Sequence, residues 1–157
     1  MKTLAIDPGY GRCGMAVLEK VGGREVLIVS LCVETSASST FPERLNQVVI
    51  ECERLLDEHS PDSMSLEKLF ITKNQKTAMH VAEVRGALIA SAASRGLPVH
   101  EYTPGQVKSA AAGWGGADKQ QVARLLTALL KITKPIKHDD EFDAIAVGVT
   151  HLAHMRG

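Results

Sequence analysis

The 157-residue sequence has few cysteines, no long apolar run and no excess of charge of either sign. Cys13, Cys32 and Cys52 lie far apart and form no CxxC pair, which argues against a disulfide framework or a zinc site and favours a reducing cytoplasm. No apolar run approaches the roughly 20 residues that a membrane-spanning helix needs. The first residues also lack the long apolar core and the cleavage site of a signal peptide. We therefore expect a cytoplasmic protein whose thiols only fill the core.

Repeats, low-complexity tracts and long linkers are also absent from the sequence. A chain of this length has the size of one compact domain with its own core. We therefore predict that residues 1–157 form a single domain.

The zero net charge hides an uneven distribution of charge along the chain. Residues 1–67 carry 6 Lys and Arg against 11 Asp and Glu, whereas residues 68–137 carry 11 Lys and Arg against 3 acidic residues. Residues 138–157 are acidic again, with 1 Arg and 4 acidic residues. A basic middle between acidic segments suits a polyanion-binding enzyme with a carboxylate site, although some of these lysines could simply occupy solvated helix faces.

The apolar pattern predicts five short strands. Residues 3–6 form a short apolar run, typical of a buried central strand, and the Asp-Pro-Gly that follows breaks it into a turn. Residues 14–18 and 25–33 are predicted to pair as a hairpin around a Gly-Gly turn. Residues 63–66 and 99–102 complete the set.

Predicted helices alternate with the later strands. Three helix starts carry capping signals, at Thr40, Thr103 and Asp118. We expect further helices over residues 77–95 and 140–155. A hairpin followed by alternating helices and strands indicates an α/β fold, in which helices flank a mixed five-stranded sheet.

Four acidic residues occupy the ends of predicted elements. Asp7 and Glu67 each follow an apolar strand, while Asp140 and Asp143 are three apart at the start of the last helix and share one face. If the two strands are neighbours and the helix packs across their ends, all four carboxylates converge. Clustered carboxylates repel and need cations, and their oxygen ligands favour Mg²⁺ or Mn²⁺ over zinc.

Each of these acids also has a simpler interpretation. Asp7 before Pro-Gly could only start a turn, and Glu67 could be a solvated strand end. Asp140 and Asp143 could only cap the helix and face the positive end of its dipole. The six histidines are dispersed, and we place His151 on the surface of the last helix. The combined placement of the four acids nevertheless favours a metal site.

The same residues lie in motifs that resemble those of the RuvC Holliday-junction resolvases, a family of crossover junction endodeoxyribonucleases. In family order, the motifs are residues 4–9, 65–70 with Lys73 and Asn74, 106–108 with 116–122, and 140–146 with Thr150 and His151. An isolated Asp-Pro-Gly is a weak signal, but an ordered set that spans nearly the whole chain is specific. The resemblance implies an RNase H-like fold and a structure-specific DNA endonuclease that resolves four-way junctions in homologous recombination and DNA repair.

The resemblance also implies the catalytic metal ligands, which would be Asp7, Glu67, Asp140 and Asp143. Asp139 is adjacent to Asp140 and could share its role. With two Mg²⁺ ions per active site, or Mn²⁺ in their place, one ion would activate a water for in-line attack. The other would stabilise the leaving 3′ oxygen, the ions lying ~3.5–4 Å apart. The products would carry 5′-phosphate and 3′-hydroxyl ends.

Residues that bind DNA are implied in the same way. Lys108 and Lys119 match basic positions near the scissile phosphate, where Lys119 would act in catalysis by offsetting developing charge. Phe70 matches an aromatic position that engages DNA at the junction, although a Phe beside a strand end is more often part of the core. The full set of DNA-binding candidates is Phe70, Lys73, Lys76, Arg85, Lys108 and Lys119.

The resemblance implies partners as well. It indicates a homodimer whose two active sites cut symmetric strands of a branched DNA, with the branch-migration proteins RuvA and RuvB as possible partners. Binding would depend on phosphate contacts and therefore on salt, and preference for a junction would come from its shape and deformability.

Two other functions are compatible with parts of the sequence. RuvC-like nucleases that process ribosomal RNA precursors share the Asp-Pro-Gly opening, but Glu67, Lys68, Lys108 and Lys119 favour the resolvase. An Asp-x-Gly turn also occurs in actin-like ATPases, which need two such domains to enclose a nucleotide, and the chain is too short for that. A junction-binding protein that no longer cuts would have lost a carboxylate, and none of the four is missing.

Overall fold

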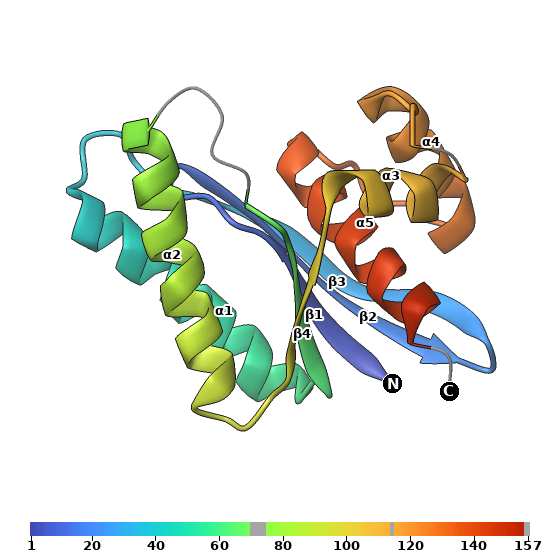
Figure 1. Ribbon diagram of the computed structural model, residues 1–157, viewed down its shortest axis with the longest axis horizontal. Coiled ribbons are helices and arrows are strands. Elements are labelled where there is room, and N and C mark those ends of the chain that lie inside the picture. The colour runs from blue at the N-terminus through green and yellow to red at the C-terminus, as the bar shows by residue number, and fades with distance from the viewer. Residues whose placement is uncertain (70–74, 114, 156–157) are drawn as a thin grey trace.

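A computed structural model describes residues 1–69, 75–113 and 115–155 of the chain. Its centre is a mixed five-stranded sheet of order β3-β2-β1-β4-β5 (Figure 1). The strands are β1 (Lys2–Asp7), β2 (Arg12–Val21), β3 (Arg24–Glu34), β4 (Ser63–Glu67) and β5 (Val99–Tyr102). The predicted α/β class and mixed five-stranded sheet are confirmed.

Strand pairing brings the ends of β1 and β4 to the same edge of the sheet. β1 runs antiparallel to β2 and parallel to β4, and the parallel register pairs Thr3 with Ser63 and Ile6 with Leu66. Asp7 follows Ile6, and Glu67 follows Leu66. The pairing of the two strands therefore places these two carboxylates side by side. The first condition for convergence of the carboxylates, that these two strands are neighbours, is therefore met.

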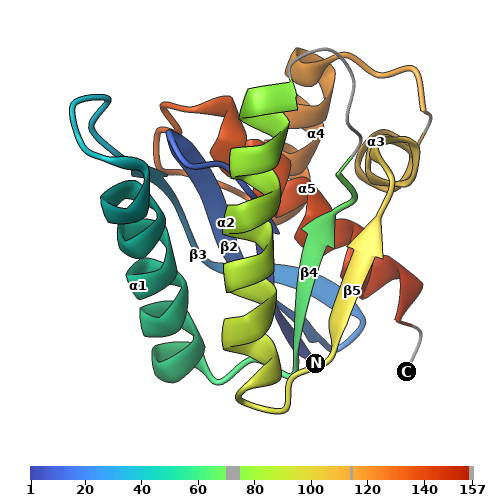
Figure 2. The ribbon, with the colours of Figure 1, turned by 60° about the vertical axis from the view of Figure 1, so that its left-hand side comes forward.

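Helices cover both faces of the sheet (Figures 1 and 2). α1 (Phe41–His59) and α2 (Gln75–Ala93) lie on one face, and α3 (Pro104–Ala112), α4 (Lys119–Leu130) and α5 (Asp139–His154) lie on the other. Side chains of β1 alternate between two apolar clusters, with Leu4 and Ile6 in one and Ala5 in the other. Within the described residues, no helix is both long and apolar enough to cross a membrane.

Polar side chains fix the starts of three helices. The Glu43 carboxylate accepts a hydrogen bond from the backbone N–H of Thr40 at 2.7 Å, and the Asp118 carboxylate accepts one from the backbone N–H of Gln121 at 2.8 Å. Thr103 caps α3 in the same way. These bonds satisfy N–H groups that the first turn of a helix leaves free, and they confirm the three predicted helix starts.

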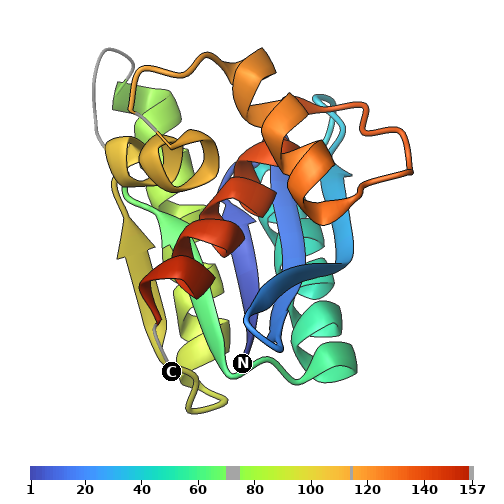
Figure 3. The same cartoon turned by 90° about the vertical axis from the view of Figure 1, so that its right-hand side faces the viewer.

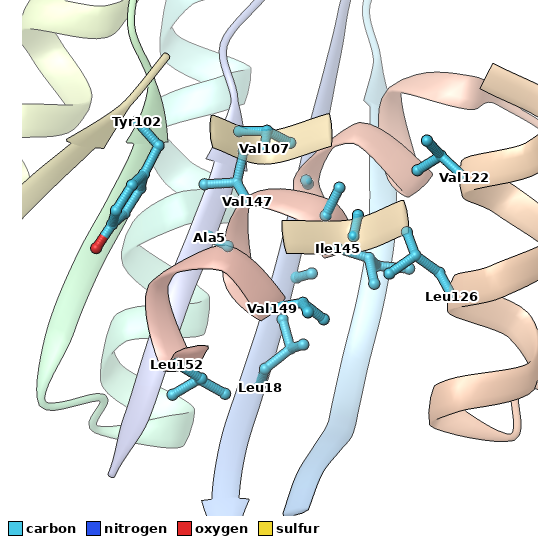
Figure 4. Packing of buried hydrophobic residues seen from close by; sticks show 14 of the residues in the cluster. Ala5, Leu18, Tyr102, Val107, Val122, Leu126, Ile145, Val147, Val149 and Leu152 are labelled. Carbon is cyan, nitrogen blue, oxygen red and sulfur yellow. The ribbon is translucent and has the colours of Figure 1, made fainter. Parts of the chain in front are cut away.

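Helix α5 crosses β1 and β2 at very short range. A Cβ added at Gly148 would lie 2.3 Å from Leu18 Cδ1 and 3.1 Å from Ala5 Cβ, so a larger residue here would require Leu18 to move. Figure 4 shows Ala5 and Leu18 in one cluster with Val147 and Val149 of α5. This contact sets the path of α5, whose first turn lies at the end of the sheet opposite the chain's N-terminus (Figure 3).

His151 is fully buried, so its predicted place on the helix surface was wrong. Its ring is hydrogen-bonded to Ser63 Oγ at 2.8 Å and to the Tyr102 hydroxyl at 2.9 Å. Burial lowers its pKa to about 4, with smaller contributions from His100 and His154. The prediction failed because α5 is enclosed by its neighbours on nearly all sides, with every residue from Ala144 to Leu152 buried.

We expect His151 to make the protein less stable as the pH falls from 6.5 towards 4. The unfolded chain gains a proton at this residue near pH 6.5, whereas the folded protein gains it only near pH 4, so protonation favours the unfolded state in this window. The loss should be on the order of 2 kcal/mol. Urea unfolding of the wild type and of His151→Gln between pH 4 and 8 measures it. An equally steep pH dependence in the variant would contradict this assignment.

Candidate active site

Asp7 lies at the centre of the predicted carboxylate cluster. It ends β1 and lines a cavity of about 280 Å³ together with Glu67 of β4 and Asp143 of α5. Burial raises the pKa of Asp7 to about 8, and the charges of Asp143, Glu67 and Asp140 add to the effect. The other three predicted carboxylates are therefore close enough to repel Asp7.

The pKa values of Glu67 and Asp143 are raised as well. Burial is the largest cause of the raised pKa of each, and the charge of Asp143 raises the pKa of Glu67 further. Lys119 lowers both pKa values but does not reverse the shifts. The cluster thus holds more negative charge than its own lysine compensates, and an added cation would stabilise it.

Gly14 allows the first turn of α5 to reach this cluster. It is the register partner of Asp7 in the β1–β2 pair. A Cβ on Gly14 would lie 1.8 Å from the backbone oxygen of Asp140 and 2.5 Å from its carbonyl carbon. Because backbone atoms cannot rotate away as a side-chain end can, any larger residue would displace the helix. The missing side chain therefore places Asp140 beside the strand that carries Asp7.

The adjacent acids Asp139 and Asp140 face different cations. Arg12 Nε, at the start of β2, lies 3.1 Å from Asp140 Oδ2. This oxygen is buried and accepts no hydrogen bond from the described residues, so the contact with Arg12 is an ion pair without hydrogen-bond geometry. Lys119 Nζ instead donates to Asp139 at 2.7 Å and to Asp143 at 3.0 Å.

Both lysines that we expected near the scissile phosphate lie at the cavity. Lys119 begins α4, and its bonds to Asp139 and Asp143 raise its pKa. Lys108 of α3 also lines the cavity, and its charge lowers the pKa of Glu67. Two positive side chains from separate helices therefore border the carboxylates.

The other predicted DNA-binding residues have varied surroundings. Arg85 of α2 is ion-paired with Glu101 of β5 and lines a second cavity next to the carboxylates. Lys76 is exposed in the first turn of α2. Phe70 and Lys73 fall outside the residues that the structure describes. The structure thus brings Lys108 and Lys119 to the carboxylates, but it leaves Lys76 on an outer surface and Arg85 in an ion pair.

Sequence reasoning did not identify two residues that shape the site, Arg12 and Gly14. A glycine inside a strand pattern can signal a close backbone approach, so Gly14 carried a weak signal. Arg12 carried none, because its partner Asp140 lies far away along the chain and the pairing depends on how α5 packs.

The donor set fits a hard divalent cation. It consists of carboxylate oxygens, which Mg²⁺ and Mn²⁺ prefer. The buried Asp140 Oδ2 lacks a hydrogen bond from the described residues, and the raised pKa of Asp7 reflects uncompensated charge. In the part of the chain that the structure describes, no three His, Cys, Asp or Glu side chains are grouped to enclose an ion. Arg12 and Lys119 contact the outer carboxylates in this arrangement.

A family profile and a relative with the same description both match nearly the whole chain. Residues 3–151 match the profile of the family described as "Crossover junction endodeoxyribonuclease RuvC". The protein of that name from Brevibacillus brevis is 40% identical over 151 residues, which cover 96% of this chain and 91% of the relative.

Solved structures agree with the sequence comparison. The structure of Thermus thermophilus RuvC has a TM-score of 0.86 at 29% identity. The match covers 96% of this chain and 93% of the Thermus chain. A second structure from that organism, in complex with a Holliday junction substrate, has a TM-score of 0.85 at 27% identity. This match covers 96% of this chain and 92% of the chain in that structure. These matches confirm the predicted RNase H-like fold.

Proposed function

This chain belongs to the RuvC family and is a crossover junction endodeoxyribonuclease, and we propose that Asp7, Glu67, Asp140 and Asp143 form its catalytic centre. One observation carries the proposal: carboxylates from β1, β4 and α5 converge at a single cavity that basic side chains also line. We further propose that residues 1–157 act as one nuclease domain, which resolves four-way junctions in recombination and DNA repair.

The four carboxylates would hold two Mg²⁺ ions, with Mn²⁺ able to replace them. When bound, these ions supply an activated water and neutralise charge on the leaving 3′ oxygen. The protein prepares this site by burying Asp7 among like charges, which raises its pKa to about 8 and so makes positive charge favourable there. The same clustering disfavours cations that prefer nitrogen or sulfur ligands.

The lysines of the cavity act on the DNA. Lys119 Nζ, next to Asp143, is placed to stabilise negative charge that develops on the scissile phosphate. Lys108 approaches from α3 and adds positive charge at the same cavity. Together they favour entry of a phosphate into a site whose carboxylates would otherwise repel it.

Binding beyond the cleaved bond would involve the basic segment of residues 68–137. In the sequence, Phe70 and Lys73 fall between β4 and α2, and Lys76 is the second residue of α2. We assign all three to contacts with DNA. Arg85 would join them by exchanging Glu101 for a phosphate. Such contacts read the backbone and make binding dependent on salt, while junction preference follows from DNA shape.

The assembly that fits a four-way junction is a homodimer. Two active sites related by symmetry would cut opposite strands and leave 5′-phosphate and 3′-hydroxyl ends that a ligase can seal. RuvA and RuvB are the partners that family membership suggests for branch migration, and the cytoplasm is the compartment.

Cleavage assays with labelled four-way junctions, linear duplex and RNA test this function. We expect paired, symmetric nicks only in junctions, in the presence of Mg²⁺ or Mn²⁺, and none with a chelator. Junction binding should weaken steeply as salt rises. Equal competition by linear duplex at moderate salt would contradict junction specificity, and cutting of RNA alone would identify a ribonuclease instead.

A further inference from the structure

The first turn of α5 separates its acidic residues onto different sides. Neighbouring residues of a helix are about 100° apart around its axis, whereas residues four apart share a face. Asp139 and Asp143 are therefore on one face, and Lys119 Nζ donates to both, at 2.7 Å and 3.0 Å. Asp140 turns towards Arg12 of β2 instead.

Asp139 lies on the exposed side of the carboxylate cluster. Asp7, Glu67 and Asp143 line the central cavity, whose described lining residues include neither Asp139 nor Asp140. Its side chain is 53% exposed, against 21% for Asp140. The charges that raise the pKa of Asp7 come from Asp143, Glu67 and Asp140, while Lys119 lowers the pKa of Asp139. What distinguishes Asp139 from Asp140 is therefore its exposure and its hydrogen bond to Lys119, since the charges of both acids raise the pKa of Asp143.

Lys119 needs such a partner to stay at the cavity. Its side chain is 66% exposed, and a lysine stem is flexible, so an ordered position costs rotamer entropy. The N-cap Asp118 fixes only the backbone at the start of α4. The contact with Asp143 competes with the metal-binding role of that carboxylate, whereas the contact with Asp139 does not.

We propose that Asp139 is a positioning residue that tethers the Lys119 ammonium at the edge of the active site, and that it is not a spare metal ligand. This inference rests on the proposed function, in which Lys119 acts on the scissile phosphate. When a cation engages Asp143, the bond to Asp139 keeps Lys119 Nζ beside the cavity. The acids in the first turns of α5 thereby have two different roles. Asp140 and Asp143 bind the cation, and Asp139 positions the lysine.

Single-turnover cutting of a four-way junction tests the tether in a double-mutant cycle. With saturating junction and Mg²⁺, Asp139→Asn should cut about tenfold more slowly, the scale of one charge-assisted hydrogen bond. Lys119→Met should cut roughly 100-fold more slowly. The double variant should be no slower than Lys119→Met, because the tether has nothing left to hold. Asp139→Glu should recover most of the rate.

Mn²⁺ binding to the free protein, followed by electron paramagnetic resonance, gives a readout that does not depend on cutting. Asp139→Asn should bind Mn²⁺ as the wild type does, whereas Asp140→Asn should bind it more weakly. Asp57→Asn is the matched control, since it breaks an exposed pair between α1 and Arg95, which lies just after the end of α2, and should leave cutting unchanged.

Two results would overturn the proposal. Weaker Mn²⁺ binding by Asp139→Asn, to the extent seen for Asp140→Asn, would make Asp139 a ligand. An equal slowing by Asp139→Asn in the wild type and in the Lys119→Met background would show an effect that does not pass through the lysine. Failure of the proposed function has a different signature: the wild type would then cut no junction in any metal, and the tether would have no reaction to serve.

Discussion

Replacing Asp7 with asparagine should abolish junction cutting and leave junction binding nearly intact. The carboxylate is buried and close to the charges of Asp143, Glu67 and Asp140. A bound cation should therefore lower the electrostatic free energy most at this position. Asparagine keeps the size of the side chain but removes the charge. We expect the cutting rate to fall by at least roughly 10²–10³-fold, the scale of losing one preorganised electrostatic contact. Gel assays of binding and cutting on the same junction measure both effects.

The same variant should be more stable than the wild type at alkaline pH when a chelator is present. The pKa of Asp7 rises from 3.8 to about 8 on folding, so its contribution to stability is fully present below pH 3.8. It is lost as the pH rises towards 8, because the charged form is buried. Asparagine carries no such penalty. The difference in unfolding free energy between variant and wild type should therefore grow from near zero at pH 4 to more than about 1 kcal/mol at pH 8.5.

This pH profile separates loss of chemistry from loss of structure. A variant that neither cuts nor binds, and that unfolds more easily at every pH, would show that Asp7 serves the fold. Asp57→Asn on α1 is again the control, because its carboxylate is exposed and pairs with Arg95. It should leave cutting unchanged.

Replacing Gly14 with alanine should impair both the fold and the reaction. The added Cβ would lie 1.8 Å from the backbone oxygen of Asp140, so the first turn of α5 must move away from β2. Overpacking of this kind costs ~1–3 kcal/mol of stability. A shift of roughly 1 Å in a catalytic group can cost about 100-fold in rate, and we expect the rate to fall by that order. Thermal unfolding and single-turnover cutting measure the two effects.

Gly86→Ala is the matched control for this substitution. Gly86 lies in α2, where an added Cβ meets no atom within 4 Å among the described residues. Alanine should stabilise the helix there by about 0.5–1 kcal/mol and leave cutting unchanged. Wild-type cutting by Gly14→Ala would mean that Asp140 does not need its close approach to β2.

The type and order of the elements could be predicted from the sequence because the signals are local. The apolar run over residues 3–6 and the caps at Thr40, Thr103 and Asp118 depend on contacts within a few residues, and all appear in the structure. The acids at the ends of elements could be picked out for the same reason. Their convergence was a conditional expectation, which needed β1 and β4 to be neighbours and α5 to cross their ends.

The rotation of α5 about its own axis was decided only by tertiary packing. Gly148 against Leu18 and Ala5 sets how the helix lies on the sheet, and this contact links segments far apart in the sequence. A turn of about 100° about the axis would exchange the roles of neighbouring residues. The distinction between Asp139 and Asp140 therefore could not be read from their spacing alone.

The sequence by itself determined the element order, the helix caps and the set of acids from which an active site could be built. Tertiary structure decided which residues meet. The backbone of Asp140 packs against Gly14, and its carboxylate pairs with Arg12. Lys119 forms an ion pair with Asp139. The tertiary structure also buried His151, which had been expected on the helix surface. The physical reason is the same in each case, since caps and periodicity act over one or two turns, whereas these contacts depend on how distant elements pack.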